Sequence, residues 1–403
     1  MRGLLLAALL VAPVIASAGC TDWDKLSRDY EGAGVCATYL VAGDVHTCVR
    51  KSSGALYCWG DNRFGQLGTG DTTSHATPTR VDFNGLGTLK VYAPAGTGEI
   101  SADVAVFTCA LASDNQFWCW GDNRFGQLGL GSTQSASRPM RVDGISGSAS
   151  KATNGGGHAC VQTNEGALYC WGKNVQGQLG LGDTQQRTSP ELVDVAGRTV
   201  ERLSAGGDFT CARGTDATLF CWGANGRGQL GIGTTDAQSK PTQVKTLGTR
   251  VGRISAGGAH VCIFTEDDGQ VWCWGDNRSG QLGTGNTDRL LVPTAIDPGG
   301  LGQVRTNQLF AGGVHTCALR DDSTLWCWGG NRFGQLGTGD VEPRLTPTQV
   351  LTGVTAAYVG GAHTCAIKMD GSVWCWGNNQ YGQLGVDVGS QSLSPARVLP
   401  PCQ

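Results

Sequence analysis

The stretch CWGDNRFGQLGTG (Cys58–Gly70) decides the fold, because versions of it recur seven times along the 403-residue chain. Each version runs from Cys-Trp-Gly to Gly-Gln-Leu-Gly, and nine or ten residues separate it from a preceding cysteine. The tryptophans of the seven Cys-Trp-Gly motifs are Trp59, Trp120, Trp171, Trp222, Trp274, Trp328 and Trp376. A period of roughly 50 residues indicates a repeat architecture, so residues 39–398 are predicted to form one cooperative assembly.

One copy contains enough turn signals for four short strands. In the seventh copy these are Thr355–Val359, His363–Lys368, Ser372–Gly377 and Pro395–Leu399. Along Leu325–Trp328 tryptophan and cysteine alternate, so bulky or apolar side chains point to both sides of the sheet. A sheet buried on both faces needs a neighbour on each side. Seven such sheets stacked radially give an all-β, seven-bladed propeller with four short antiparallel strands per blade.

The cysteines form a second regular pattern. Fourteen of the seventeen fall into seven in-register pairs. The pairs are Cys48 with Cys58, Cys109 with Cys119, Cys160 with Cys170, Cys211 with Cys221, Cys262 with Cys273, Cys317 with Cys327, and Cys365 with Cys375. An Asp-Gly turn at Asp370 would place Cys365 and Cys375 opposite each other on antiparallel strands, within reach of a disulfide.

The N-terminus is typical of an export signal. Arg2 precedes the apolar stretch 4–15, which is too short to span a bilayer, so residues 1–19 are predicted to be a signal peptide. Ala18-Gly19-Cys20 is similar to a bacterial lipobox and predicts lipidation of Cys20, while Ala16-Ser17-Ala18 would suit ordinary cleavage. We therefore expect an extracytoplasmic protein, either lipid-anchored to the envelope or secreted, with a tether over residues 20–34 and the propeller over 35–403.

Three cysteines remain outside the repeats. If Cys20 carries lipid, Cys36 and Cys402 are left to pair, and this disulfide would lock the first blade to the last. The alternative is a bond between Cys36 and an unlipidated Cys20, which would leave Cys402 free.

The motifs resemble the RCC1 (regulator of chromosome condensation) repeat family over about nine-tenths of the chain. The resemblance rests on Cys58–Gly70, on Pro78, and on AGGVHTCAL at Ala311–Leu319. It implies a seven-bladed β-propeller, and it raises guanine-nucleotide exchange on a small GTPase as an alternative function. The export signal, the disulfides and the missing basic tail all disfavour that alternative.

Residues shared by all copies are expected to be scaffold. The tryptophans should pack between blades, the leucine of Gly-Gln-Leu-Gly should fill the core, and the glutamine amide should tie the loop backbone. His46, His158, His260, His315 and His363 each precede a cysteine by two residues. Phe107 and Phe209 hold the same place in two copies, so we expect structural histidines and no metal site.

Function is expected where the copies differ. Charged residues make up 16% of the chain and the net charge is only −3, which argues against a nucleic-acid partner. No catalytic motif or cofactor signature occurs, which favours a non-catalytic scaffold for a protein or glycan over an enzyme with a site at the propeller axis. The insertion within residues 81–100 could contact a partner. The candidate partner-binding residues, from the turn before Gly-Gln, are Arg63, Phe64, Arg124, Phe125, Arg278, Arg332, Phe333 and Tyr381.

Overall fold

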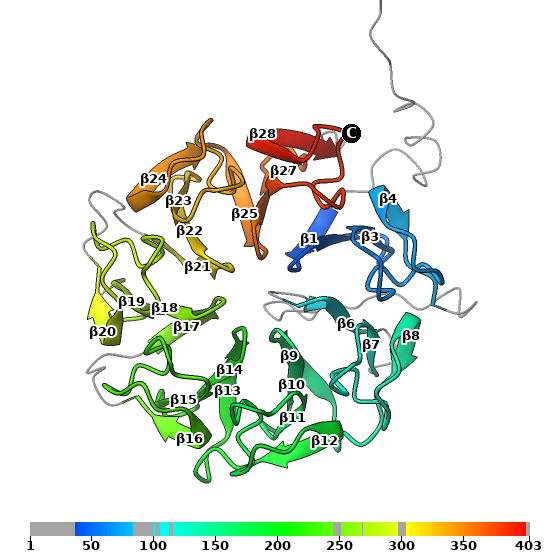
Figure 1. Cartoon of the computed structure of the whole chain (residues 1–403), viewed down its shortest axis with the longest axis vertical. Helices are drawn as coiled ribbons and strands as arrows, with labels where there is room; N and C mark the ends of the chain where they lie inside the picture. Colours follow the sequence, from blue (N-terminus) through cyan, green and yellow to red (C-terminus); the bar gives the residue numbers. More distant parts are fainter. Residues whose placement is uncertain are drawn as a thin grey trace, which may run out of the picture.

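The computed structural model describes residues 37–83, 100–101, 105–112, 116–244, 251–267, 269–296 and 304–399. In these ranges the chain forms seven four-stranded antiparallel sheets, which stand around a central axis as the blades of a propeller (Figure 1). No helix in the same ranges is long and apolar enough to cross a membrane.

Each blade takes four strands that are consecutive in sequence. The bounds for blades 1 to 3 are β1 (Ala37–Ala42), β2 (His46–Lys51), β3 (Leu56–Gly60), β4 (His75–Arg80); β5 (Ile100–Ser101), β6 (Phe107–Leu111), β7 (Phe117–Gly121), β8 (Ala136–Arg141); β9 (Ala149–Asn154), β10 (His158–Thr163), β11 (Leu168–Gly172), β12 (Arg187–Val193). For blades 4 and 5 they are β13 (Val200–Ala205), β14 (Phe209–Gly214), β15 (Leu219–Gly223), β16 (Gln238–Gln243); β17 (Val251–Ala256), β18 (His260–Thr265), β19 (Val271–Gly275), β20 (Leu290–Ala295). For blades 6 and 7 they are β21 (Val304–Ala311), β22 (His315–Arg320), β23 (Leu325–Gly329), β24 (Arg344–Leu351); β25 (Val354–Val359), β26 (His363–Lys368), β27 (Val373–Asn378), β28 (Gln391–Leu399).

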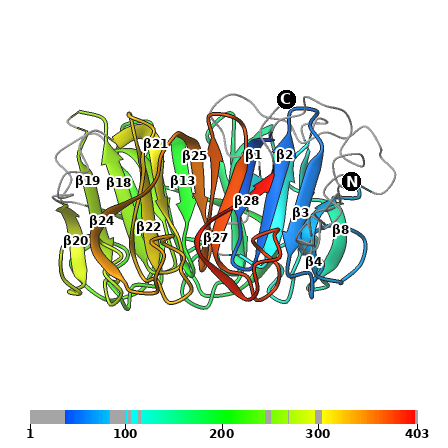
Figure 2. The same ribbon diagram turned by 90° about the horizontal axis from the view of Figure 1, so that it is seen from above.

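The strand order within a blade defines two faces of the disc. The first strand of each blade lies at the axis and the fourth at the rim (Figure 1), and the strands run from one face of the disc to the other (Figure 2). Because neighbouring strands are antiparallel, the turns between first and second strands share a face with the loops between third and fourth strands. We call this the loop face. The opposite face carries the hairpins between second and third strands and the blade-to-blade connections.

The core lies between blades rather than within them. One hydrophobic cluster joins Cys48, Cys58 and Leu67 of blade 1 to Trp120 of blade 2. Alternation explains this arrangement, since the cysteine on a strand faces the following blade and the adjacent tryptophan faces the preceding one. All seven tryptophans of the Cys-Trp-Gly motifs are completely buried, as are the seven leucines of Gly-Gln-Leu-Gly. Their predicted packing roles are confirmed.

The seven predicted blade disulfides are present in the structure, and each joins the second and third strands of one blade at directly opposed positions. The bonded pairs are Cys48 with Cys58, Cys109 with Cys119, Cys160 with Cys170, Cys211 with Cys221, Cys262 with Cys273, Cys317 with Cys327, and Cys365 with Cys375. Their Cα atoms lie 4.1 to 4.2 Å apart. This separation is that of a non-hydrogen-bonded pair on antiparallel strands, the geometry expected from the hairpin turns.

One pair differs from the others in its spacing along the chain. Cys262 and Cys273 are 11 residues apart, whereas the other six pairs are separated by 10. Cys262 still lies directly opposite Cys273 in the ladder of β18 and β19. The additional residue is therefore taken up in the hairpin turn, and the strand register is kept.

The outer strands contain a proline at one equivalent position. These residues are Pro78, Pro139, Pro190, Pro241, Pro293, Pro347 and Pro395. In blade 1 the ladder between β3 and β4 is irregular between the pairs Cys58–Thr79 and Gly60–His75, and Pro78 lies in that gap. Proline has no N–H to offer a further strand, so it protects the exposed edge of each blade.

The predicted strands of the seventh copy agree with β25 to β28, except that β28 begins at Gln391, four residues before Pro395. Several predictions lie outside the described residues and stay predictions. These are the signal peptide, the lipid on Cys20, the disulfide between Cys36 and Cys402, and a partner contact in the insertion, most of which falls in 84–99.

Candidate binding face

The loop between the third and fourth strands is organised by two shared amides. In blade 1, Asn62 Oδ1 accepts the Leu67 N–H at 3.0 Å, and Gln66 Oε1 accepts the Phe64 N–H at 3.0 Å. The same two bonds recur in all seven blades. The predicted role of the glutamine amide is confirmed. The role of the asparagine was missed, although its presence in every copy is a signal that sequence reasoning could have used.

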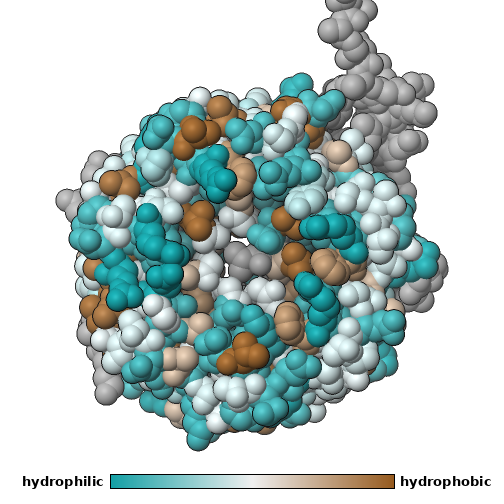
Figure 3. Space-filling view, in the orientation of Figure 1, coloured by the Kyte–Doolittle hydropathy of each residue, from teal (hydrophilic) through white to brown (hydrophobic). Residues whose placement is uncertain are grey.

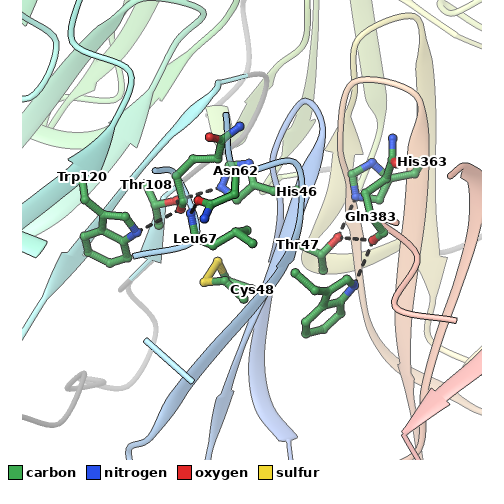
Figure 4. Close-up of a disulfide and its surroundings, with 12 residues drawn as sticks. His46, Thr47, Cys48, Asn62, Leu67, Thr108, Trp120, His363 and Gln383 are labelled. Atoms are coloured by element: carbon green, nitrogen blue, oxygen red, sulfur yellow. Dashed lines mark hydrogen bonds between the residues drawn. A yellow bond between two sulfur atoms is a disulfide. The ribbon is translucent and has the colours of Figure 1, made fainter. Parts of the chain in front are cut away.

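The backbone carbonyl of the same glutamine joins one blade to the next (Figure 4). Gln66 O accepts the Trp120 Nε1–H at 2.9 Å and the Thr108 Oγ1–H at 3.0 Å. The tryptophan bond occurs at all seven junctions between blades. Gly68 has a positive φ of 71°, and a Cβ there would lie 2.8 Å from Trp120 Nε1. Glycine is therefore required for the loop to reach its neighbour.

The five histidines complete this junction. His46 Nε2 lies 2.7 Å from the Oγ1 of Thr108 in the next blade. Because Thr108 already donates its hydroxyl proton to Gln66 O, the imidazole must donate through Nε2–H, which leaves Nδ1 without a proton. Burial lowers the pKa of His46 to about 4, so the ring is neutral at physiological pH.

Equivalent His–Thr pairs occur at four other junctions, and the two remaining junctions are apolar. The further pairs are His158–Thr210, His260–Thr316, His315–Thr364 and His363–Thr47. Where a blade has Phe107 or Phe209 in place of histidine, the next blade has Ala159 or Val261 in place of threonine, in the same hydrophobic clusters. Each histidine therefore has a structural partner in the next blade.

The candidate partner-binding residues all lie on the loop face, and the arginines are held there by carboxylates. Arg63 Nε and Nη2 donate to the two oxygens of Asp61 at 2.9 and 3.1 Å. The Arg63 side chain is 59% exposed, whereas that of Asp61 is fully buried. The hydrogen bond and charge of Asp61 raise the pKa of Arg63.

The same arrangement holds two further arginines of the loop face. Arg124 bonds to Asp122, and Arg278 bonds to Asp276. Burial pushes the pKa of Asp276 upward, but the hydrogen bonds and charge of Arg278 outweigh it and leave the pKa below its usual range.

Cations and aromatic rings alternate across four successive blades. The guanidinium of Arg63 lies 4.7 Å from the ring centre of Tyr381 in blade 7, and that of Arg124 lies 4.5 Å from the ring centre of Phe64 in blade 1. Lys173 of blade 3 continues the series, 5.5 Å from Phe125 of blade 2. We call these six residues, Tyr381, Arg63, Phe64, Arg124, Phe125 and Lys173, the cation–aromatic array.

The other candidates lie on the same face outside the array. Arg332 lies over its own neighbour Phe333 at 5.7 Å, and Arg278 bonds to Asp276. Sequence reasoning missed Lys173 and the supporting aspartates as members of the site. Asp precedes Arg by two residues in three copies, and that spacing was the available signal.

The surface around the axis mixes hydrophilic and hydrophobic groups. Viewed along the axis, hydrophilic side chains are spread over the disc, and smaller hydrophobic patches lie among them, both near the central opening and toward the rim (Figure 3). In the described ranges, no group of three or more His, Cys, Asp or Glu residues could hold a metal ion. The arrangement offers exposed cations and aromatic rings on a rigid support, which is a composition suited to binding.

Family models match the repeats directly. The RCC1-like domain matches residues 193–402, and the regulator of chromosome condensation (RCC1) repeat matches residues 38–66, 53–92, 114–162 and 165–213. The chain belongs to the RCC1 repeat family. An RCC1 propeller was predicted from the repeats, and the prediction is confirmed.

Two curated relatives from this family illustrate the range of proteins that contain the repeat. The ultraviolet-B receptor UVR8 of Arabidopsis thaliana is 31% identical over 77% of this chain and 69% of its own length. The E3 ubiquitin-protein ligase HERC2 of Homo sapiens is 33% identical over 76% of this chain, a match that covers only 6% of the ligase.

Solved structures share the fold at lower identity. Human WBSCR16 superposes with a TM-score of 0.73 at 24% identity, over 82% of this chain and 86% of its own. Prp20p of Saccharomyces cerevisiae, whose structure was described with its binding to Gsp1p and histones, gives 0.68 at 20% identity over 93% and 89%. Both show the propeller fold.

Proposed function

We propose that this RCC1 propeller is a non-catalytic binding scaffold that recognises a protein partner through its loop face. The observation that carries the proposal is the cation–aromatic array, in which exposed arginines are fixed by buried carboxylates and aromatic rings. Arginine and aromatic side chains dominate the binding energy of protein interfaces. Side chains that are already ordered lose less conformational entropy on binding.

The differences between copies support the same face. Residues shared by all copies, such as Asn62 and Gln66, make hydrogen bonds that hold the loops and the junctions between blades. The positions that vary between copies, such as Arg63 and Val175, are exposed on the loop face. Binding surfaces on a regular scaffold commonly combine a fixed backbone with side chains that vary.

We further propose that the chain acts outside the cytoplasm, anchored by lipid on Cys20. Seven blade disulfides are consistent with an oxidising compartment. In that compartment a cytosolic GTPase would be out of reach, so we do not propose nucleotide exchange. Intact-mass measurement of the native protein tests the anchor. A mature N-terminus without an acyl addition on Cys20 would refute it.

A quantitative pull-down from extract of the native envelope tests the binding proposal. The bait is the purified protein as wild type, as R63E/R124E, and as the matched control R198E. Arg198 lies over Phe220 at 5.2 Å and bonds to Asp216 at 2.8 Å, so it has the same kind of support on the opposite face. We expect a partner that is captured by wild type and R198E and lost with R63E/R124E. Equal capture by all three baits would contradict the proposal.

A further inference from the structure

The arginines of the array keep an edge that their aspartates do not use. Arg63 and Arg124 each spend Nε and Nη2 on a buried aspartate. Among the residues that the structure describes, no further acceptor bonds to Arg124, and the further acceptor at Arg63 is Tyr381, whose hydroxyl oxygen lies within hydrogen-bonding reach of the guanidinium. Each guanidinium therefore presents N–H donors in a fixed plane, and the remaining edge has the geometry that binds a carboxylate or phosphate oxygen.

The carboxylate that holds Arg63 is more deeply buried than that of an ordinary surface ion pair. Exposed ion pairs contribute little to stability, yet Asp61 is fully buried and takes a further bond from Gln66 Nε2 at 3.0 Å. One side of the guanidinium plane of Arg63 faces Tyr381 of the neighbouring blade. The buried aspartate and the aromatic ring together fix the orientation of the guanidinium, as a preorganised anion-binding group requires.

A cation over the ring of the preceding blade occurs again at the next two blades, whereas Arg278 of blade 5 keeps its aspartate but follows a blade that has Arg227 at the position of Phe64. The Arg124 guanidinium over Phe64 and the Lys173 ammonium over Phe125 continue the array, and Lys173 Nζ bonds to Asp208 at 3.0 Å. In blade 4, Ala224 and Gly226 stand at the positions of Asp61 and Arg63. The array thus occupies one sector of the ring, over blades 7, 1, 2 and 3.

The geometry points to an acidic segment of the protein partner, with Asp or Glu side chains alternating with apolar ones, as the ligand of the cation–aromatic array. This inference rests on the proposed function and specifies the chemistry of its partner. The carboxylates would accept from the remaining edges of Arg63 and Arg124. Apolar side chains would pack on the partly buried rings of Phe64, Phe125 and Tyr381, which lie between the cations.

A protein segment fits this surface better than a nucleic acid does. The net charge of the chain is −3, and the array is flanked by the carboxylate of Asp208 in the inner turn of blade 4. A continuous polyanion gains its affinity from many cations, whereas the array supplies Arg63, Arg124 and Lys173, and Lys173 is already paired with Asp208. A protein segment can place a few carboxylates over the arginines and other groups elsewhere.

A selection from a phage-displayed library of random peptides, made on the immobilised full chain, tests the inference. We expect selected peptides to be enriched in Asp and Glu next to aromatic or aliphatic residues. Synthetic copies of them should bind R63Q/R124Q about tenfold more weakly, or worse, by fluorescence anisotropy. R63K/R124K, which keeps the charge but not the bidentate bonds, should bind with intermediate affinity. R198Q should bind like wild type.

The outcomes separate the inference from the proposed function. Peptides that depend on Arg63 and Arg124 but carry no acidic enrichment would overturn the inference and leave the loop face as a binding surface. Peptides that bind wild type and R63Q/R124Q equally, at equal thermal stability, would overturn it as well. Tight, Arg63-dependent binding of a single-stranded oligothymidylate would replace the acidic segment with a nucleic acid.

Discussion

At the scale of single residues, a junction that contains histidine consists of four hydrogen-bonded groups. In the junction of blades 3 and 4, His158 Nε2 donates to Thr210 Oγ1, and Thr210 donates to Gln178 O, which also accepts the Trp222 Nε1–H. All of these groups are buried, so each must find its partner within the protein. Substitutions here should therefore be strongly coupled across the junction.

The substitution Thr210→Val should cost roughly 1 to 3 kcal/mol of unfolding free energy, because it leaves a buried Nε2–H on His158 without an acceptor. The double variant H158F/T210V should recover most of this loss, because it reproduces the apolar junction of Phe209 and Val261. Denaturant unfolding of the oxidised protein measures both. Additive costs in the double variant would show that the two residues do not act as a pair.

The buried histidines should also make the fold sensitive to acid. Burial lowers the pKa of His46, His158 and His260 to about 4, and burial with neighbouring histidines lowers that of His315 and His363 to about 3. Well above pH 6.5 these rings are neutral in both folded and unfolded chains. Below it the unfolded chain takes up protons first, so stability falls as the pH drops toward 4.

The expected slope approaches about 1.4 kcal/mol per pH unit for each histidine once the pH is well below 6.5. Unfolding free energies measured between pH 7.5 and 5 check the slope. The variant H158F/T210V lacks one of these histidines, so its slope of unfolding free energy against pH should be smaller by about 1.4 kcal/mol per pH unit. A stability that does not change over this range would contradict the neutral, buried assignment.

At the scale of elements, much of a blade could be predicted from the sequence. The strands, the hairpin turns and the disulfide between Cys48 and Cys58 depend on residues within about 20 positions of one another, and the turn chemistry reveals them. The junction could not be predicted in the same way. His46 pairs with Thr108 of the next copy, so the matched change to Phe107 and Ala159 falls in two different copies. Comparing equivalent positions of the copies one at a time does not reveal it.

The outer strands lead to a prediction about association. Replacing Pro78, Pro190 and Pro241, all partly buried, by threonine adds backbone N–H groups on three outer strands. We expect little change in unfolding temperature but greater self-association at high concentration, measured by light scattering. Pro343→Thr, in an exposed loop, is the control. Unchanged scattering in the triple variant would show that these prolines do not protect the edges.

At the scale of the whole molecule, the ring is closed by the same chemistry as every other junction. Trp59 Nε1 and Thr47 Oγ1 donate to Gln383 O at 3.0 and 2.8 Å, and His363 pairs with Thr47 (Figure 4). In the described part of the chain every blade is built from consecutive strands, and the first and last blades exchange none of them. The position of the array on one sector of this ring was not predictable, because it depends on contacts between different blades.

The predicted disulfide between Cys36 and Cys402 would reinforce the closing junction. The chain-entropy model gives a ceiling of about 6 kcal/mol for so long a loop. Non-reducing peptide mapping of the mature protein should find this bond. A peptide that joins Cys20 to Cys36 would contradict both the closure and the lipid anchor.

The central claim is that the residues shared by all blades hold the ring, and those that differ on the loop face bind the partner. The most direct test places a photoreactive benzoylphenylalanine at Phe64 or at Met369 in the native cells. Phe64 belongs to the array, whereas Met369 lies on the opposite face and is 72% exposed. The account predicts a discrete protein adduct from position 64 and none from position 369. An adduct from position 369 with none from position 64 would contradict it.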